Sequence, residues 1–373
     1  MVSHYPLRMC DHPTLNQRTT RACGLAVLFV LLILTATAQA QGRRKVIIDQ
    51  DGAGPGGTDM QAIAALVNSP STEVLGICVL TGDAWRDEEI QHTLRLLEIL
   101  GRTDIPVLPG AVFPLLNSKA FVARWETIYG KVSYQGAWNY GRPTLHGPYD
   151  VPPLAEGTPT TKASAEAAAA FLVRTVRQFP HEVTVYAAGP MTDLALAIGL
   201  DPQFPELTKE LVVMGGSIRP ITDDPQFGPS ARREFNFWMD PEATRMVLHA
   251  RWPRVTLTTV DISVKTRMDT RLIGELARAS TPGAQYLAKY AEVSYLWDEI
   301  AAVAWLDPTL ITRSRRLYVD VDVDHGAGYG ETLAWAPGDE PGLGEQLVDV
   351  QEDLDRDRFY RMFVDLLSRA SSH

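Results

Sequence analysis

Short apolar runs alternate along the chain with segments whose apolar residues recur at helical spacing. The expected strands are Val46–Ile48, Val74–Leu80, Val107–Leu108, Val183–Ala188, Leu211–Met214, Val255–Val260, Leu317–Val323 and Glu331–Ala336. The expected helices are Met60–Asn68, Glu88–Leu100, Lys162–Gln178, Met191–Ile198, Pro241–Ala250, Asp269–Ala279, Pro282–Trp305 and Asp353–Leu367. Alternation of this kind predicts an α/β fold, an open and mostly parallel sheet with helices on both faces.

Two long stretches interrupt the alternation. Phe113–Pro159 and Ser217–Arg233 exceed ordinary loop lengths, and such segments are often lids or binding loops. Aromatic residues in the first of them are candidates for closing over a bound ring or for packing the insert down: Trp125, Trp138 and Tyr140. No linker rich in Pro, Gly and Ser separates two cores, so we expect a single domain over residues 41–373.

The first forty residues have the pattern of a secretory signal peptide. Arg18 and Arg21 precede the apolar run Gly24–Leu34, and Ala38-Gln39-Ala40 is a cleavage site of small residues. Because the apolar run is shorter than the roughly 20 residues of a spanning helix, cleavage after Ala40 is favoured over an uncleaved anchor. The sequence predicts an exported protein, periplasmic or extracellular, with no membrane attachment once residues 1–40 are removed.

Charge and cysteine content narrow the class of partner. The formal net charge is −10, and removal of residues 1–40, which hold three arginines and one aspartate, leaves −12. This argues against a broad surface for nucleic acid polymers and leaves small neutral or cationic substrates. Cys10 and Cys23 belong to the signal segment. Cys78 lies in an apolar run, so we expect it to be buried and unpaired.

Carboxylates gather where the first predicted strand ends. Lys45–Leu66 reads KVIIDQDGAGPGGTDMQAIAAL, so Asp49 and Asp51 follow the apolar run and Asp59 opens the next helix. Ligands of open α/β sheets bind at the carboxyl ends of the strands. Three acids at this edge repel one another unless a cation compensates them, and Ca²⁺ and Mg²⁺ prefer carboxylate oxygens. The pattern therefore predicts a metal site at the mouth of the sheet.

The same loop has two other interpretations. It spells G-x-G-x-x-G between a strand and a helix, at Gly52, Gly54 and Gly57. This is the fingerprint of a dinucleotide-binding oxidoreductase, with Asp83 as a ribose acid. The charges of Asp49 and Asp51 and the stiffness of Pro55 count against a pyrophosphate there. In the other interpretation, Asp51 and Asp59 are only turn and helix-cap residues.

Further motifs follow the later strands. They are Gly189–Leu196 (GPMTDLAL), Val212–Gly216 (VVMGG), Glu234–Ala243 (EFNFWMDPEA) and Tyr295–Glu299 (YLWDE). Together with the acids of the first loop, they resemble the motifs of the calcium-dependent nucleoside hydrolases, the inosine–uridine-preferring type and its relatives. Glu234–Ala243 is the most specific match. Order and spacing agree from about Lys45 to the C-terminus.

The resemblance implies hydrolysis of the N-glycosidic bond of a ribonucleoside to free base and ribose. It implies that Ca²⁺ is held by Asp51, Asp59, Asp298 and the backbone carbonyl of Ala188. It also implies that Asp51, as general base, takes a proton from a Ca²⁺-bound water that attacks C1′ of the ribosyl group. Family members are commonly dimers or tetramers, which makes a homo-oligomer possible.

Substrate contacts also follow from the resemblance. Glu234 and Asn236 would hold ribose hydroxyls, and Asp83 would contact the base or the surroundings of the metal. Asp49 and Thr58 are expected to support the site from outside the metal and substrate contacts, Asp49 by orienting the loop.

Departures from the family pattern concern the substrate more than the fold. The family has two consecutive acids where this chain has Thr58 and Asp59, and the loop before them is longer here. Trp297 replaces the histidine of the inosine–uridine type. A Trp-Asp pair resembles the purine-specific branch, so Trp297 is a candidate for stacking on a purine or for core packing. An asparagine expected shortly before Glu234 has no clear counterpart. A catalytically degenerate nucleoside- or sugar-binding protein on the same fold is therefore an alternative.

Overall fold

The computed structural model describes Met1, residues 42–139 and residues 146–371. The predicted signal segment, the cleavage site after Ala40 and Tyr140 lie outside these residues. Arg44–His373 forms one compact unit. Within the described ranges, none of the helices has the length and apolar character needed to cross a membrane.

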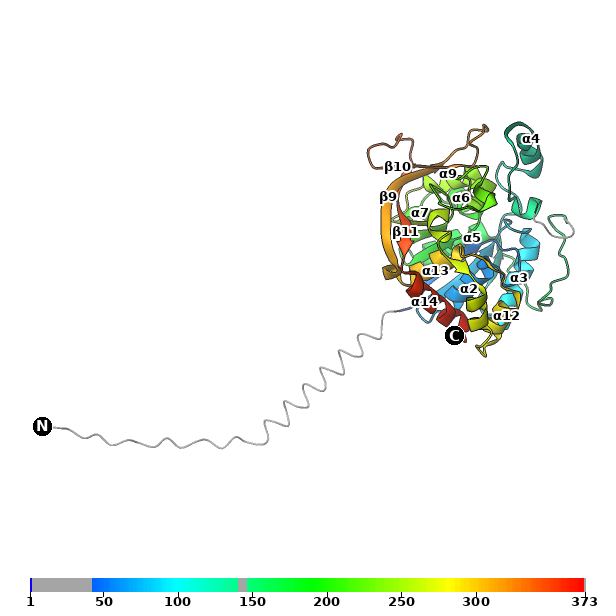
Figure 1. Ribbon diagram of the computed structural model, residues 1–373, viewed down its shortest axis with the longest axis vertical. Helices are drawn as coiled ribbons and strands as arrows, with labels where there is room; N and C mark the ends of the chain where they lie inside the picture. Colours follow the sequence, from blue (N-terminus) through cyan, green and yellow to red (C-terminus); the bar gives the residue numbers. More distant parts are fainter. Residues whose placement is uncertain (2–41, 140–145, 372–373) are drawn as a thin grey trace. The chain divides into compact units, whose positions relative to one another are not determined.

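In the described residues, nine strands form one sheet in the order β10-β9-β11-β6-β5-β4-β1-β2-β3 (Figure 1). Their bounds are β1 Arg44–Gln50, β2 Thr72–Val79, β3 Val107–Pro109, β4 Val183–Ala187, β5 Glu210–Met214, β6 Val255–Thr258, β9 Ile311–Val321, β10 Thr332–Trp335 and β11 Gln346–Leu354. Neighbours from β3 to β11 pair in parallel, and β9 is antiparallel to both β10 and β11. The predicted mostly parallel sheet is confirmed.

The order of the strands reverses at β1. From β1 the chain moves outward to β2 and β3, then returns to β4 on the other side of β1 and continues to β5 and β6. Such a reversal opens a crevice at the carboxyl ends of the two adjacent strands, because the connections that leave them cover opposite faces. β1 ends at Gln50 and β4 at Ala187, so Asp51 and Ala188 both border this crevice.

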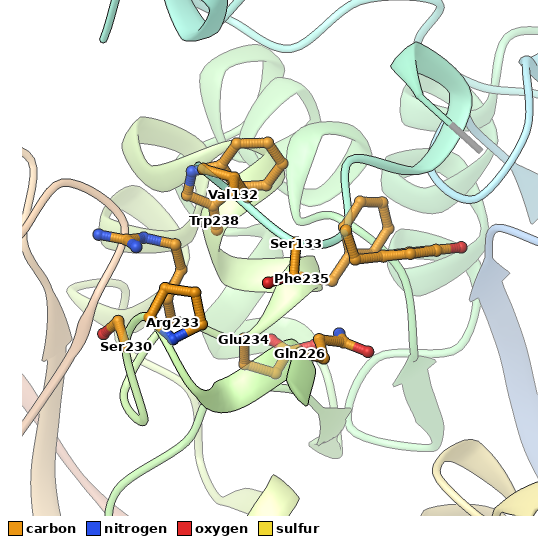
Figure 2. A pocket seen from close by; sticks show the side chains of 10 residues that line it. Val132, Ser133, Gln226, Ser230, Arg233, Glu234, Phe235 and Trp238 are labelled. Carbon is orange, nitrogen blue, oxygen red and sulfur yellow. The ribbon is translucent and has the colours of Figure 1, made fainter. Parts of the chain in front are cut away.

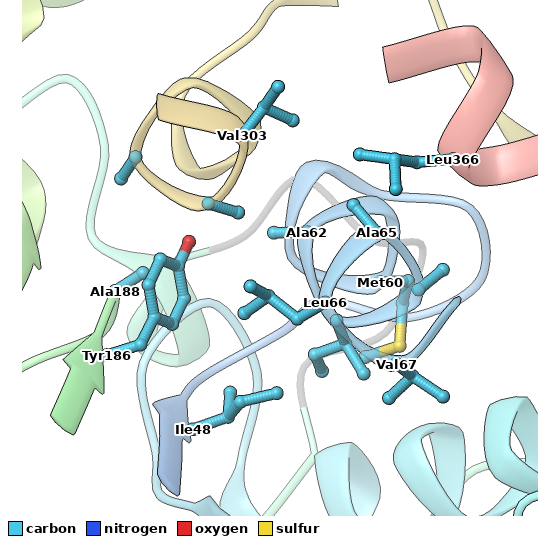
Figure 3. Close-up of a cluster of buried hydrophobic side chains, with 14 of the residues drawn as sticks. Ile48, Met60, Ala62, Ala65, Leu66, Val67, Tyr186, Ala188, Val303 and Leu366 are labelled. Atoms are coloured by element: carbon cyan, nitrogen blue, oxygen red, sulfur yellow. The ribbon is translucent and has the colours of Figure 1, made fainter. Parts of the chain in front are cut away.

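Helices cover both faces of the sheet, as the sequence predicts. The first face carries α2 (Thr58–Asn68), α3 (Arg86–Leu100), α11 (Thr270–Leu276), α12 (Pro282–Tyr290), α13 (Asp298–Leu306) and α14 (Arg356–Ser368). The second carries α5 (Ala168–Gln178), α6 (Thr192–Leu200), α7 (Phe204–Leu207) and α9 (Pro241–Leu248). β1 shows why its run is continuously apolar: Val46 and Ile48 pack in the first core and Ile47 in the second. Figure 3 shows Ile48 beside α2 residues and Tyr186 in the first core.

The remaining elements are short and lie mainly in loops. They are α4 (Lys119–Tyr129), α8 (Phe235–Met239), α10 (Val260–Ser263), η1 (Gly136–Trp138), η2 (Pro225–Phe227), η3 (Pro308–Leu310) and the antiparallel pair β7 (Arg267–Met268) and β8 (Ser294–Tyr295). Trp125 and Trp138 of the long insert are buried in a third core that also contains Trp85 and Trp238. These two tryptophans therefore pack the insert down and do not close over a ring.

One predicted helix is wrong, and one strand was not predicted. The helix expected over Pro282–Trp305 is divided by β8, so that Trp297 is the N-cap of α13 and Asp298 lies in its first turn. β11 was not predicted, because its sequence QLVDVQEDL mixes polar and apolar positions. Its acids pair with arginines across the sheet, Asp349 with Arg254 and Glu352 with Arg315.

Candidate active site

The loops at the crevice enclose a cavity of about 300 Å³. Every site residue predicted from the sequence lines it except Asp49: Asp51, Thr58, Asp59, Asp83, Ala188, Glu234, Asn236, Trp297 and Asp298. A smaller pocket shares part of this wall (Figure 2), since Gln226, Glu234 and Phe235 line both. Loops that are up to 247 residues apart in sequence, from Asp51 to Asp298, thus meet at one place.

Asp51 lies between two loops that approach it closely. A Cβ on Gly82 would lie 1.8 Å from Asp51 Oδ2, and a Cβ on Gly189 would lie 2.9 Å from the Asp51 nitrogen. Glycine is therefore required at both positions, one after β2 and one after β4. The backbone N–H of Asp83 donates to Asp51 Oδ2 at 3.0 Å and fixes this carboxylate at the cavity wall.

Asp51, Asp59 and Asp298 are each only 3% exposed. Burial raises the pKa of all three carboxyls, and repulsion adds to it, from Asp83 on Asp51 and from Asp59 on Asp298. Among the described residues, none of the three forms an ion pair with lysine, arginine or histidine. Full ionisation of this cluster therefore requires an added positive charge.

The amide of Gln50 joins these groups. Its Nε2 donates to Asp59 Oδ1 at 3.1 Å, to Asp298 Oδ2 at 3.1 Å and to the carbonyl oxygen of Ala188 at 2.8 Å. In the described part of the chain, no three Asp, Glu, His or Cys side chains have a ready metal-coordinating arrangement. The chemistry of the donors nevertheless fits a hard cation, because carboxylate and carbonyl oxygens are the ligands of Ca²⁺ and Mg²⁺.

Glu234 and Asn236 also line the cavity and are held by the start of α8. The Glu234 carboxylate accepts from the backbone nitrogens of Asn236 at 2.8 Å, Phe237 at 3.1 Å and Gly216 at 2.8 Å. Burial raises the pKa of Glu234, and these bonds oppose the rise. Asn236 Nδ2 donates to the Met214 carbonyl at 3.2 Å. Both side chains are held in place before any substrate arrives.

Aromatic side chains form another wall. The Trp297 ring packs against Tyr295 at 5.3 Å and against Phe227 at 6.1 Å between centroids, and both Trp297 and Phe227 line the cavity. Tyr134 of the long insert also lines it and donates to Asp83 Oδ1 at 2.7 Å. The combination of an acidic floor, a polar wall and an aromatic wall suits a ligand with a sugar and a planar ring.

Comparison with known proteins decides the family. Residues 46–361 match the family described as inosine-uridine preferring nucleoside hydrolase. The chain belongs to this family.

Named relatives of this nucleoside hydrolase support the assignment. It is 33% identical over 274 residues to probable uridine nucleosidase 2 of Arabidopsis thaliana, covering 72% of this chain and 76% of that one. It is 27% identical over 340 residues to the pyrimidine-specific ribonucleoside hydrolase RihA of Citrobacter koseri, covering 87% and 96%. A solved plant nucleoside hydrolase superposes with a TM-score of 0.67 at 25% identity, covering 87% and 99%.

Membership selects among the interpretations of the first loop. The nucleoside hydrolase is an enzyme that hydrolyses the N-glycosidic bond of small-molecule ribonucleosides, and its family is generally metal-dependent. The G-x-G-x-x-G sequence of the loop is therefore not a dinucleotide fingerprint, and the degenerate binding protein is not supported.

Thr58 makes a contact that the sequence did not reveal. Its hydroxyl donates to Glu299 Oε2 at 2.5 Å, and the same oxygen accepts from the Trp297 nitrogen at 2.9 Å. Glu299 is fully buried, and burial raises its pKa to about 8. Where the family has a second acid, this nucleoside hydrolase has a hydroxyl bonded to a neighbouring acid. The adjacency of two acids in YLWDE was the available signal.

Asp49 lies outside the cavity, but its side chain forms no hydrogen bond to the described residues of the loop that it was expected to orient. It is 2% exposed, and its carboxylate oxygens have no hydrogen-bond partner among the described residues. Burial raises its pKa, and Asp193 adds repulsion. The side chain that contacts the predicted metal-binding atoms is instead that of its neighbour, Gln50. Cys78 is buried and unpaired, as predicted.

Proposed function

We propose that this nucleoside hydrolase is an exported, Ca²⁺-dependent enzyme that cleaves purine ribonucleosides to free base and ribose. The observation that carries the proposal is one cavity lined both by aromatic side chains and by three buried carboxylates, none of which has a cationic partner among the described residues. The carboxylates and the aromatic side chains are adjacent in the sequence, since Trp297 immediately precedes Asp298. Export is supported by the signal pattern of residues 1–40.

Three carboxylates and one carbonyl would hold the cation: Asp51, Asp59, Asp298 and the oxygen of Ala188. All four residues line the cavity, and their oxygens suit Ca²⁺. When bound, the cation supplies the charge that positions a water and makes it more acidic.

Asp51 would accept the proton of the attacking water. It borders the crevice, and the bond from the Asp83 nitrogen to Oδ2 keeps its carboxylate oriented. A positioned general base contributes about 10²- to 10⁴-fold in rate. Glu234 and Asn236 would bind ribose hydroxyls and hold the sugar while positive charge develops at C1′. Because both side chains are already bonded to backbone groups, little ordering is left for the substrate to impose.

The purine assignment depends on Trp297. Its ring lines the cavity beside the acids, where it can stack on a base and where the inosine–uridine type has a histidine. A second candidate is a pyrimidine nucleoside, which the names of the Arabidopsis and Citrobacter relatives favour.

A nucleoside panel tests the proposal. The purified enzyme is incubated with inosine, adenosine, guanosine, uridine and cytidine at saturating Ca²⁺, and released bases are separated by liquid chromatography. We expect the highest kcat/KM with a purine nucleoside. A higher value with uridine or cytidine would contradict the purine assignment and support the second candidate. Absence of release from every nucleoside would contradict the proposed activity itself.

A further inference from the structure

We propose that Gln50 is a positioning residue of the cation site. Its amide holds Asp59, Asp298 and the Ala188 carbonyl from the buried side and leaves their cavity side to the ion. The inference rests on the Ca²⁺ dependence in the proposed function and goes beyond it, because it assigns a role to the residue between the two acids of the first motif.

Burial places the amide behind its partners. Gln50 is 0% exposed, whereas Asp59, Asp298 and Ala188 line the cavity. The single nitrogen Nε2 reaches one oxygen of each partner within 3.1 Å. These partners come from α2, the start of α13 and the end of β4, so one side chain connects three elements that are distant in sequence.

The chemistry of an amide suits this position. Its two N–H groups are shared among three acceptors, two of them carboxylates that repel each other. A neutral donor reduces this repulsion without adding charge to the site, and each oxygen keeps a lone pair for the ion. Hydrogen bonds to metal ligands generally orient them, and loss of such a partner typically costs about 10- to 100-fold in metal affinity.

The alternation of β1 makes position 50 the one that reaches these groups. Ile48, two residues earlier, is buried in the first core. Asp49 points to the other face of the sheet, where Asp193 and Cys78 are its electrostatic neighbours. If the amide of Gln50 is removed, no adjacent side chain of β1 can therefore take over its hydrogen bonds.

The test compares Gln50→Met with a matched control, Gln61→Met. Methionine is nearly isosteric with glutamine and donates no hydrogen bond. Gln61 is also buried, at 2% exposure, and its Nε2 donates at 2.8 Å to the Gly56 carbonyl, which is not one of the proposed cation ligands. The Ca²⁺ dissociation constant of each chelator-treated protein is measured by isothermal titration, without substrate. Melting temperatures in chelator record the stability of each variant.

We expect Gln50→Met to raise the Ca²⁺ dissociation constant about 10- to 100-fold and the control to leave it nearly unchanged. At each Ca²⁺ concentration, the activity of Gln50→Met should follow its Ca²⁺ occupancy, because Gln50 does not line the cavity. A purely structural role would lower the melting temperature of Gln50→Met without moving its dissociation constant, and this would overturn the inference.

One other result would also overturn it. Tighter Ca²⁺ binding by Gln50→Met would mean that the amide competes with the ion. Absence of Ca²⁺ binding by the wild-type protein would instead refute the cation in the proposed function, a failure distinguishable from that of Gln50 alone. Should Gln50→Met not fold, Gln50→Asn retracts the amide by one methylene group and is expected to weaken binding in the same way.

Discussion

Replacing Trp297 by alanine removes the ring that the proposed purine site requires. Tyr295 and Phe227 pack against this ring, at 5.3 and 6.1 Å between centroids, and hold it in place. Stacking of a base on an aromatic side chain is worth about 1–3 kcal/mol by alanine substitution. Since about 1.4 kcal/mol is a factor of ten, we expect kcat/KM for inosine to fall about 5- to 150-fold.

The assay compares inosine with uridine for the Trp297→Ala, Trp297→Phe and Trp305→Phe variants at saturating Ca²⁺. Trp297→Phe keeps a ring and should retain most of the activity. Trp305 lies near the end of α13, the helix that Trp297 caps. It contacts Arg44 and Glu210, which begin β1 and β5, so its phenylalanine variant is the matched control. An equal loss with inosine and uridine in Trp297→Ala, or no loss, would refute the stacking role and assign Trp297 to packing.

Three further predictions concern other parts of the molecule. Asp51→Asn keeps the side chain's shape but removes the base, so kcat should fall about 10²- to 10⁴-fold with unchanged circular dichroism; full turnover would place the base elsewhere. Although burial opposes ionisation of Glu98, hydrogen bonds from residues 160–161 lower its pKa from 4.5 to about 2. Because the folded pKa is the lower one, this stabilisation is present above pH 4.5 and is lost as the pH falls towards 2. Glu98→Gln should therefore lower the free energy of unfolding at pH 7 by about 1.5–3 kcal/mol. Urea titrations should show that this difference between the wild-type protein and the variant disappears at acid pH. Asp240 caps α9 and also accepts bonds from Leu115 and Thr192, so Asp240→Ala should cost about 1–3 kcal/mol in the same titration; a loss within error would contradict its structural role.

Local sequence was enough to locate much of the fold and of the site. Parallel strands are buried on both faces, so β1, β4 and β5 are visible as continuous apolar runs. The residues that follow those strands meet at the crevice, which is why the position of the acid after β1 in the chain was enough to place it there. The carbonyl after β4 was expected only from the resemblance to the family. β11 was not predicted because its acidic side chains pair with arginines of neighbouring strands, and no local sequence pattern indicates such pairing.

The missing parts of the site depend on side-chain direction and on long-range contacts. Gln50 stood between two acids in the first motif, and only the three-dimensional structure shows that its amide reaches α13, 248 residues away. Tyr134 donates to Asp83, which is 51 residues away in the sequence. It lies in an insert whose sequence has no regular pattern, so this contact could not be predicted. Glu299 was visible as a second acid beside Asp298, but its bond to Thr58 depends on the break between α12 and α13, which periodicity did not predict.

The most direct test of the account is to follow Ca²⁺ occupancy and nucleoside cleavage in the same sample. Chelator-treated enzyme is titrated with Ca²⁺, bound metal is quantified after rapid desalting, and release of base from inosine is recorded at each point. The account predicts that the rate rises in proportion to occupancy and reaches its maximum at one ion per chain. Full activity of the chelated enzyme, with no bound metal, would contradict the role given to Asp51, Asp59 and Asp298.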